Sequence, residues 1–184
     1  MKRIIIAAAF VTLATAPQAW GQTDAERIER ALMAAPEQSR QSATVIDWNP
    51  DHTYRTLKEG TTPLVCYDWS GELGEPAFSV QCTSKANLPR VAQSRQFAEE
   101  SADRAALQAR HRAAEEDGSR IAPEFGSLFT SMTGPDRENA RMHTTIAVPG
   151  ATAASLGLPE DAAQGGAWIM QAGSSYAHIM TPGH

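Results

Sequence analysis

The sequence predicts an α+β fold in which a long charged helix packs on one face of an antiparallel sheet. Three observations predict it. Short runs with the two-residue period of strands occur in both halves of the chain, and a charged segment at 89–116 contains no glycine and has the period of a helix. No internal repeat or linker divides the chain. These features are typical of a single α+β domain.

The first 21 residues have the layout of a secretory signal peptide. Lys2 and Arg3 precede an apolar run at 4–16, and small residues stand before a cleavage point after Gly21. The run is shorter than the roughly 20 residues that a membrane-spanning helix needs. We therefore expect residues 1–21 to be removed and 22–184 to form one periplasmic or secreted domain, with no integral membrane segment after cleavage.

The charge balance restricts the partners. The chain has 16 basic and 21 acidic residues, a net charge of −5, and it contains no basic run. Nucleic acid and anionic membrane surfaces attract basic proteins, so neither is an expected partner. An unknown small ligand or an envelope component is the expected partner instead.

The first predicted element after the cleavage point is a short amphipathic helix. Thr23 and Glu26 have the spacing of a capping box, which satisfies free N–H groups at a helix start. Ile28 and Leu32 share one face, and Pro36 ends the helix.

Four strands are expected next. The segment 42–48 is rich in β-branched residues, 49–52 is a turn, and 53–60 alternates in polarity. Two further strands are expected within 61–69 and 77–82. Together they predict a small antiparallel unit.

Cys66 and Cys82 are the only cysteines, and each lies in one of these strands. An even pair in an oxidising compartment most simply forms one disulfide. A metal or redox pair is the alternative, but the spacing is not C-x-x-C and two cysteines make an incomplete zinc site.

The middle of the chain is predicted to be helical. Alanines at helical spacing form a small-residue stripe along 89–116, with charged residues on the other faces and a break in the helix near Ser101. Apolar residues after this helix again have helical spacing: Phe125, Leu128, Phe129 and Met132.

The last third returns to strands. One strand is expected at 140–149, with Met142, Thr144 and Ile146 on one face and His143, Thr145 and Ala147 on the other. A helical turn and loop follow at 150–161. Two strands at 167–172 and 176–181 then form a closing hairpin, which turns at Gly173 and is anchored by Trp168.

The sequence contains few signals for nucleophilic catalysis. The nucleophile elbow G-x-S-x-G is absent, because Gly173-Ser174-Ser175 has no closing glycine. A hydrolase would have to use His178 as its base with Ser174 or Ser175 as its nucleophile. The paired carboxylates lie in polar runs typical of solvated surface.

A metal site is the second alternative. His178 and Met180 lie two residues apart and so point to one side of a strand, and Met142 and His143 lie in a neighbouring strand. Imidazole and thioether suit monovalent copper, and exported bacterial copper carriers use similar His-x-Met elements. The competing interpretation is that the methionines are packing residues, with no cofactor.

The C-terminal element GGAWIMQAGSSYAHIM resembles that of an uncharacterised family of small secreted bacterial proteins, to which no function is assigned. The similarity extends from Cys82 to Met180 and also includes CTSKANLPRVAQSRQF and VPGATAASLGLPE. The family element reads Gly-Gly-Pro-Trp and then Gly-Thr-x-x-Ala-His-Ile-Met, and this chain has Ala167 and Ser174 at the proline and threonine. The matching positions include Gly165, Gly166, Trp168, Gly173 and His178. The resemblance implies membership, and no catalytic residue is carried over.

The function expected from the sequence is therefore that of an exported, non-enzymatic binding or envelope-associated protein. The expectation rests on the signal peptide, the acidic charge and the lack of a catalytic signature. Copper binding and hydrolysis are the alternatives.

Overall fold

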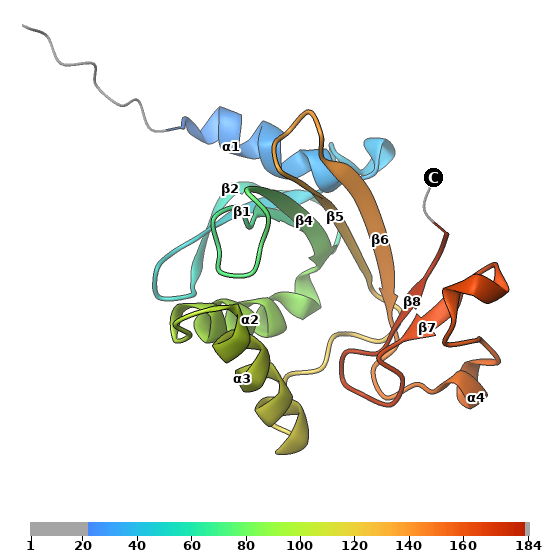
Figure 1. Ribbon diagram of the computed structural model, residues 1–184. Coiled ribbons are helices and arrows are strands. Elements are labelled where there is room, and N and C mark those ends of the chain that lie inside the picture. Colours follow the sequence, from blue (N-terminus) through green and yellow to red (C-terminus); the bar gives the residue numbers. More distant parts are fainter. Residues whose placement is uncertain (1–21, 183–184) are drawn as a thin grey trace, which may run out of the picture.

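The computed structural model describes residues 22–182, which form one eight-stranded sheet with helices on both faces (Figure 1). The predicted signal peptide at 1–21 lies outside the described residues. The strands are β1 (Thr44–Trp48), β2 (Tyr54–Lys58), β3 (Leu64–Asp68), β4 (Phe78–Ser84), β5 (Leu128–Gly134), β6 (Arg141–Ala147), β7 (Trp168–Met170) and β8 (His178–Met180). Their spatial order is β2-β1-β3-β4-β5-β6-β8-β7.

Six of the seven strand pairs are antiparallel, which confirms the predicted α+β class. The exception is the pair of β1 and β3, which run parallel. After β2, the chain crosses past the start of β1 and enters β3 on the other side of β1. Gly60 makes this passage: a Cβ there would lie 2.4 Å from backbone atoms of Ser42 and Ala43. Only a residue without a side chain fits so close to another backbone.

The first helix, α1 (Asp24–Ala31), begins at the predicted capping box. The backbone N–H of Thr23 donates to Glu26 Oε2 at 2.7 Å, and the Glu26 N–H donates to Thr23 Oγ1 at 3.3 Å. A 3₁₀ turn (Leu32–Ala34) follows, and the helical segment ends before Pro36 as predicted. Helix α1 covers one face of the sheet (Figure 1).

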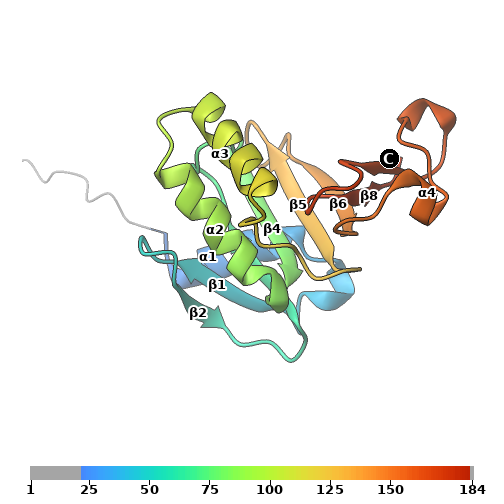
Figure 2. The same cartoon turned by 90° about the horizontal axis from the view of Figure 1, so that it is seen from below.

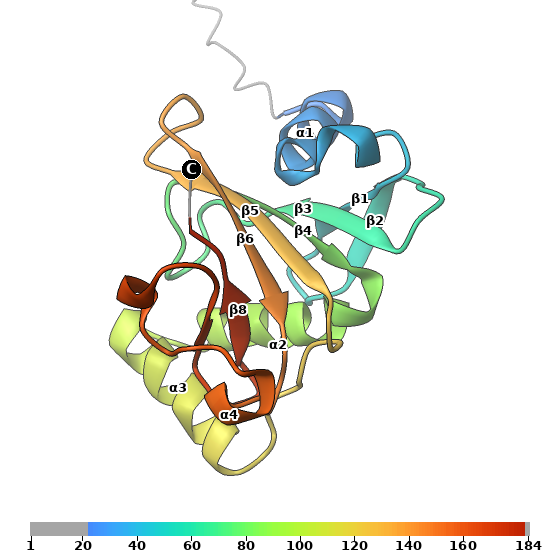
Figure 3. The same cartoon turned by 90° about the vertical axis from the view of Figure 1, so that its right-hand side faces the viewer.

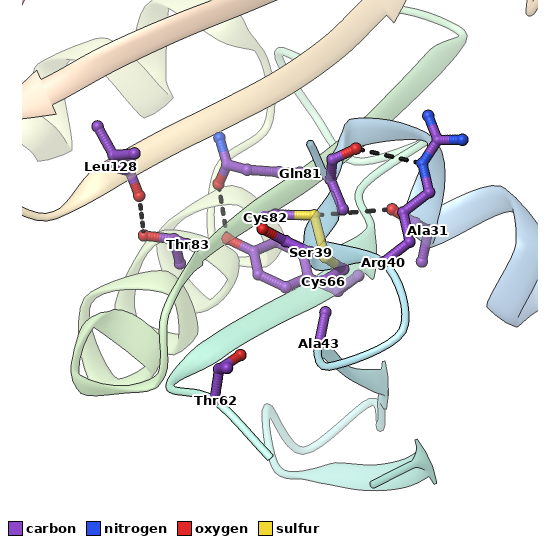
Figure 4. The surroundings of a disulfide bond; sticks show 12 residues. Ala31, Ser39, Arg40, Ala43, Thr62, Cys66, Gln81, Cys82, Thr83 and Leu128 are labelled. Carbon is purple, nitrogen blue, oxygen red and sulfur yellow. Dashed lines mark hydrogen bonds between the residues drawn. A yellow bond between two sulfur atoms is a disulfide. The ribbon is translucent and has the colours of Figure 1, made fainter. Parts of the chain in front are cut away.

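The disulfide between Cys66 and Cys82 is present, with the two residues directly opposite each other on β3 and β4 (Figure 4). Both side chains are fully buried beneath the helical segment, and Cys82 Sγ lies 3.9 Å from the carbonyl oxygen of Ala31. The disulfide is thus part of the apolar cluster between α1 and the sheet, and this cluster also contains Val45 and Val80.

The predicted long helix is two helices, α2 (Leu88–Glu99) and α3 (Arg104–Glu116), separated near Ser101. The second begins at Asp103, whose side chain accepts a hydrogen bond from the N–H of Ala106 at 2.8 Å. An N-cap of this kind fixes the start of a new helix. Helix α2 packs on the face opposite α1, where Leu88 and Val91 meet an apolar cluster of Ile46, Val65 and Tyr67 (Figure 2).

The helical interpretation of Phe125, Leu128, Phe129 and Met132 is wrong, because Leu128–Gly134 is strand β5. This strand lies between β4 and β6 and is hydrogen-bonded to both. The apolar spacing fits a helix, but β5 pairs with a neighbouring strand on each side, and this tertiary context outweighs the local period.

The C-terminal segment forms α4 (Ala153–Leu156) and the β7–β8 hairpin, at the same end of the molecule as α3 (Figure 3). The two strands have three residues each and are shorter than predicted. Positive φ angles occur at Gly165, Gly166 and Gly173, where the chain enters the hairpin and turns. The buried anchor of the hairpin is Ile169, whereas Trp168 is half-buried on the other face.

Candidate functional site

The β7–β8 hairpin determines which way His178 faces. His178 pairs with Met170 on β7 and with Ala147 on β6, and the next residue, Ile179, pairs with Ile169. Cross-strand partners share a face and successive residues alternate. Ile169 is fully buried in an apolar cluster against which Ile179 packs. His178 therefore lies on the face of the sheet opposite Ile169 and Ile179. Over strands β1 and β3, this same face is covered by α2.

The register separates the residues of the predicted metal set. His178 and Met180 share one face, and His143 shares it too, because it lies two residues from Thr145, the partner of Met180. Met142 is on the opposite face, where it pairs with Met132. Met142 is thus not placed with the other three.

The predicted pairing of His178 with a serine is not formed among residues 22–182. His178 Nδ1 lies 2.7 Å from the carbonyl oxygen of Tyr176. The Ser174 hydroxyl donates to the carbonyl of Gln171 at 2.7 Å, and the Ser175 hydroxyl donates to Glu115 at 2.5 Å. Because a general base must reach the proton that it abstracts, this geometry gives no support to the hydrolase alternative.

Ser175 instead ties the hairpin turn to the helices. Glu115 on α3 accepts from both the Ser175 hydroxyl and the Ser175 N–H, the latter at 3.0 Å. Arg90 on α2 donates to the Ser175 hydroxyl at 3.2 Å and to the carbonyl of Ile121. The Arg90 guanidinium also lies 5.3 Å from the ring centre of Tyr176.

A second arginine lies beside the first. Arg120 follows α3 and donates to Gln93 Oε1 and Ser94 Oγ, both at 2.6 Å. Burial, together with the positive charge of Arg90, lowers the pKa of Arg120 to about 10. Burial also lowers the pKa of Arg90. Within residues 22–182, neither guanidinium forms an ion pair with a carboxylate.

An open cleft of about 590 Å³ lies between the end of α3 and the hairpin turn. We call it the α3–hairpin cleft. Its walls are Ala114, Glu115, Glu116, Gly118 and Arg120 on one side and Ala172, Gly173, Ser174 and Ser175 on the other. It thus joins a half-buried guanidinium to a turn rich in hydroxyl groups.

No local sequence pattern predicts this site. Arg90 and Arg120 are not part of a basic run, and Glu115 lies in an acidic stretch that resembles solvated surface. The three come together only because α2, the segment after α3 and the hairpin turn converge. The part that could be found from sequence was the Gly-Ser turn.

His111 on α3 also lies in this region, with its ring 5.4 Å from that of Phe97. Burial, together with the positive charges of Arg120 and Arg90, lowers the pKa of His111 to about 4, while Glu115 acts in the opposite direction. The unfolded chain therefore binds a proton between pH 6.5 and 4 that the folded protein does not bind. Stability consequently falls as the pH falls through this window.

We expect His111→Gln to remove this part of the pH dependence. Between pH 7 and pH 4 the free energy of unfolding of the wild type should fall by about 1–2 kcal/mol more than that of the variant, less than the full linkage value because the ring is only half-buried. Urea unfolding of both proteins at several pH values measures the difference. If the free energy of unfolding fell equally with pH in both proteins, His111 would not be the source of this pH dependence.

Residues 22–182 contain no group of three or more His, Cys, Asp or Glu side chains that could hold a metal ion. In the same residues, no helix is both long enough and apolar enough to cross a membrane. No family model, curated protein or solved structure matches the chain.

Proposed function

We propose that this protein is an exported, non-enzymatic binding protein that takes a small anion in the α3–hairpin cleft. The observation that carries the proposal is a pair of guanidiniums that donate only to neutral acceptors: that of Arg120, which is half-buried in the cleft wall, and that of Arg90, which is buried beside it. Export is supported by the signal-peptide pattern at 1–21 and by the disulfide, which is typical of oxidising compartments.

The electrostatic argument concerns uncompensated charge. A buried charge is costly unless it is paired, and a guanidinium binds carboxylate or phosphate through two parallel hydrogen bonds. The nearby carboxylate is that of Glu115, and two donors from Ser175 already occupy it. An incoming anion would supply the counter-charge that Arg120 lacks.

The cleft also limits the class of ligand. Its volume is within the usual range for small-molecule sites, about 300–1,000 Å³. Glu115 and Glu116 stand in the same wall as Arg120, so a second negative charge on the ligand would be repelled. These walls favour a group with one negative charge, a carboxylate or a singly ionised phosphate, either on a free small molecule or on an envelope component.

Isothermal titration calorimetry tests the proposal with acetate, glycylglycine and inorganic phosphate as probes. We expect millimolar or tighter binding of at least one probe, and we expect Arg120→Gln to weaken that binding at least tenfold. Sedimentation with anionic lipid vesicles separates a free anion from an envelope headgroup as the source of the charge.

Arg112→Gln is the matched control, because Arg112 is an exposed arginine on α3 outside the cleft walls. This variant changes the net charge equally and should bind like the wild type. If Arg112→Gln weakened anion binding as much as Arg120→Gln does, the binding would be due to general charge attraction, and the proposal of a specific site would be contradicted. The absence of heat with all three probes together with the absence of vesicle binding would contradict it as well.

A further inference from the structure

We propose a second, separate site on the β7–β8 hairpin: a soft-metal site in which Met170, His178 and Met180 bind monovalent copper or silver, with Trp168 beside them. It differs from the α3–hairpin cleft in position and in chemistry. The proposal does not depend on anion binding.

The strand register brings the ligands to one face. Met170 lies directly opposite His178, and Trp168 lies directly opposite Met180. Opposite residues in antiparallel strands have Cβ atoms about 4.5–5.5 Å apart, and residues two apart on one strand are separated by about 6.5–7 Å. Methionine side chains have three rotatable bonds, so both sulfur atoms can converge on the imidazole.

The hydrogen bond of His178 leaves the correct nitrogen free. Nδ1 lies 2.7 Å from the carbonyl oxygen of Tyr176, which can only accept, so Nδ1 carries the proton. Nε2 then has the lone pair that a metal needs. Metal-binding histidines commonly donate their other ring N–H to a carbonyl in this way.

The side chains on this face of the hairpin are partly accessible, with the ring of Tyr176 packed edge-on against that of His178 at 5.1 Å. Met170 is 38% exposed, and His178 and Met180 are half-buried. On the β6 side the partner of His178 is Ala147, which has a small side chain. His143 on β6 is the diagonal neighbour of Met180 and is exposed. Side chains at diagonal positions are within reach of each other when they are long, so His143 can act as a fourth ligand.

The ligand types select the metal. Two thioethers and one imidazole are soft and neutral, and such ligands favour monovalent copper over Mg²⁺, Ca²⁺ or Mn²⁺, which prefer oxygen. No thiolate competes, because both cysteines of the chain are in the disulfide.

Titration with Ag⁺ tests the site, since silver needs no reductant and leaves the disulfide intact. Calorimetry of the purified mature protein should show one equivalent bound, and the tryptophan fluorescence, to which Trp168 contributes together with Trp48 and Trp69, should be partly quenched. Met170→Leu and Met180→Leu should each weaken binding at least tenfold, and His178→Gln should weaken it further. Leucine and methionine are similar in volume, so circular dichroism should show the two leucine variants folded, and the same measurement checks the fold of His178→Gln.

The matched control is Met142→Leu, because Met142 is an exposed methionine on the opposite face of the sheet. This variant and Arg120→Gln should bind Ag⁺ like the wild type. A flat titration of the wild type would overturn the proposal. Equal weakening by Met142→Leu, or unchanged binding by the Met170 and Met180 variants, would overturn it as well.

Discussion

Replacement of Cys66 and Cys82 together by alanine should lower the free energy of unfolding by about 3–5 kcal/mol. The disulfide closes a loop with a sequence separation of 16, and this constraint on the unfolded chain contributes about 3 kcal/mol. Both sulfur atoms are fully buried among apolar side chains, so their removal also leaves a small cavity under α1.

Urea unfolding of the double variant and of the wild type measures this difference. Unfolding of the wild type in reducing agent is the matched control, since it breaks the bond but keeps the sulfur atoms. It should reproduce the loop-closure part of the loss without the cavity part. A loss below about 1 kcal/mol in the double variant, or two free thiols in the oxidised protein, would contradict the structural role of the bond.

The elements that sequence alone predicted well are those specified by neighbouring residues. Thr23 and Glu26 determine the start of α1 within a single turn, and Pro36 ends the helical segment. The strand pair that carries Cys66 and Cys82 follows from alternation and from the pairing of the only two cysteines. In each case the interactions that form the element lie close together in the sequence.

The elements that were missed depend on distant residues. Segment 125–132 has apolar residues at helical spacing, yet β4 and β6 make it a strand by pairing with it on both sides. The parallel pairing of β1 with β3 depends on the close passage at Gly60. Neither effect has a signature within one window of sequence.

The candidate sites divide in the same way. The hairpin with His178 and Met180 was identified from its sequence, since a period of two places both side chains on one face. Arg90 and Arg120 lie 30 positions apart with no common motif, and their proximity results from the packing of α2 against the segment after α3. Sequence therefore predicted the soft-metal candidate, and only the structure reveals the anion candidate.

The second large effect is expected at Asn87, which is fully buried where β4 leads into α2. Its amide N–H groups donate to Thr83 Oγ1 at 2.7 Å and to Ser127 Oγ at 2.9 Å. Its carbonyl oxygen accepts from the N–H of Glu124 at 2.7 Å. One side chain thus joins β4, the start of α2 and the segment that leads to β5 through three hydrogen bonds.

Asn87→Ala should lower the free energy of unfolding by about 3 kcal/mol, since each buried hydrogen bond contributes about 1 kcal/mol and unpaired partners add to the loss. Asn87→Leu distinguishes the cause, because leucine fills the volume but makes no hydrogen bond. If the network stabilises the fold, the leucine variant is at least as unstable as the alanine variant in urea unfolding. Asn139→Ala, which removes an exposed asparagine from a turn, should cost less than about 1 kcal/mol. Recovery of wild-type stability by Asn87→Leu would show that packing, and not hydrogen bonding, holds β4 and α2 to the segment before β5.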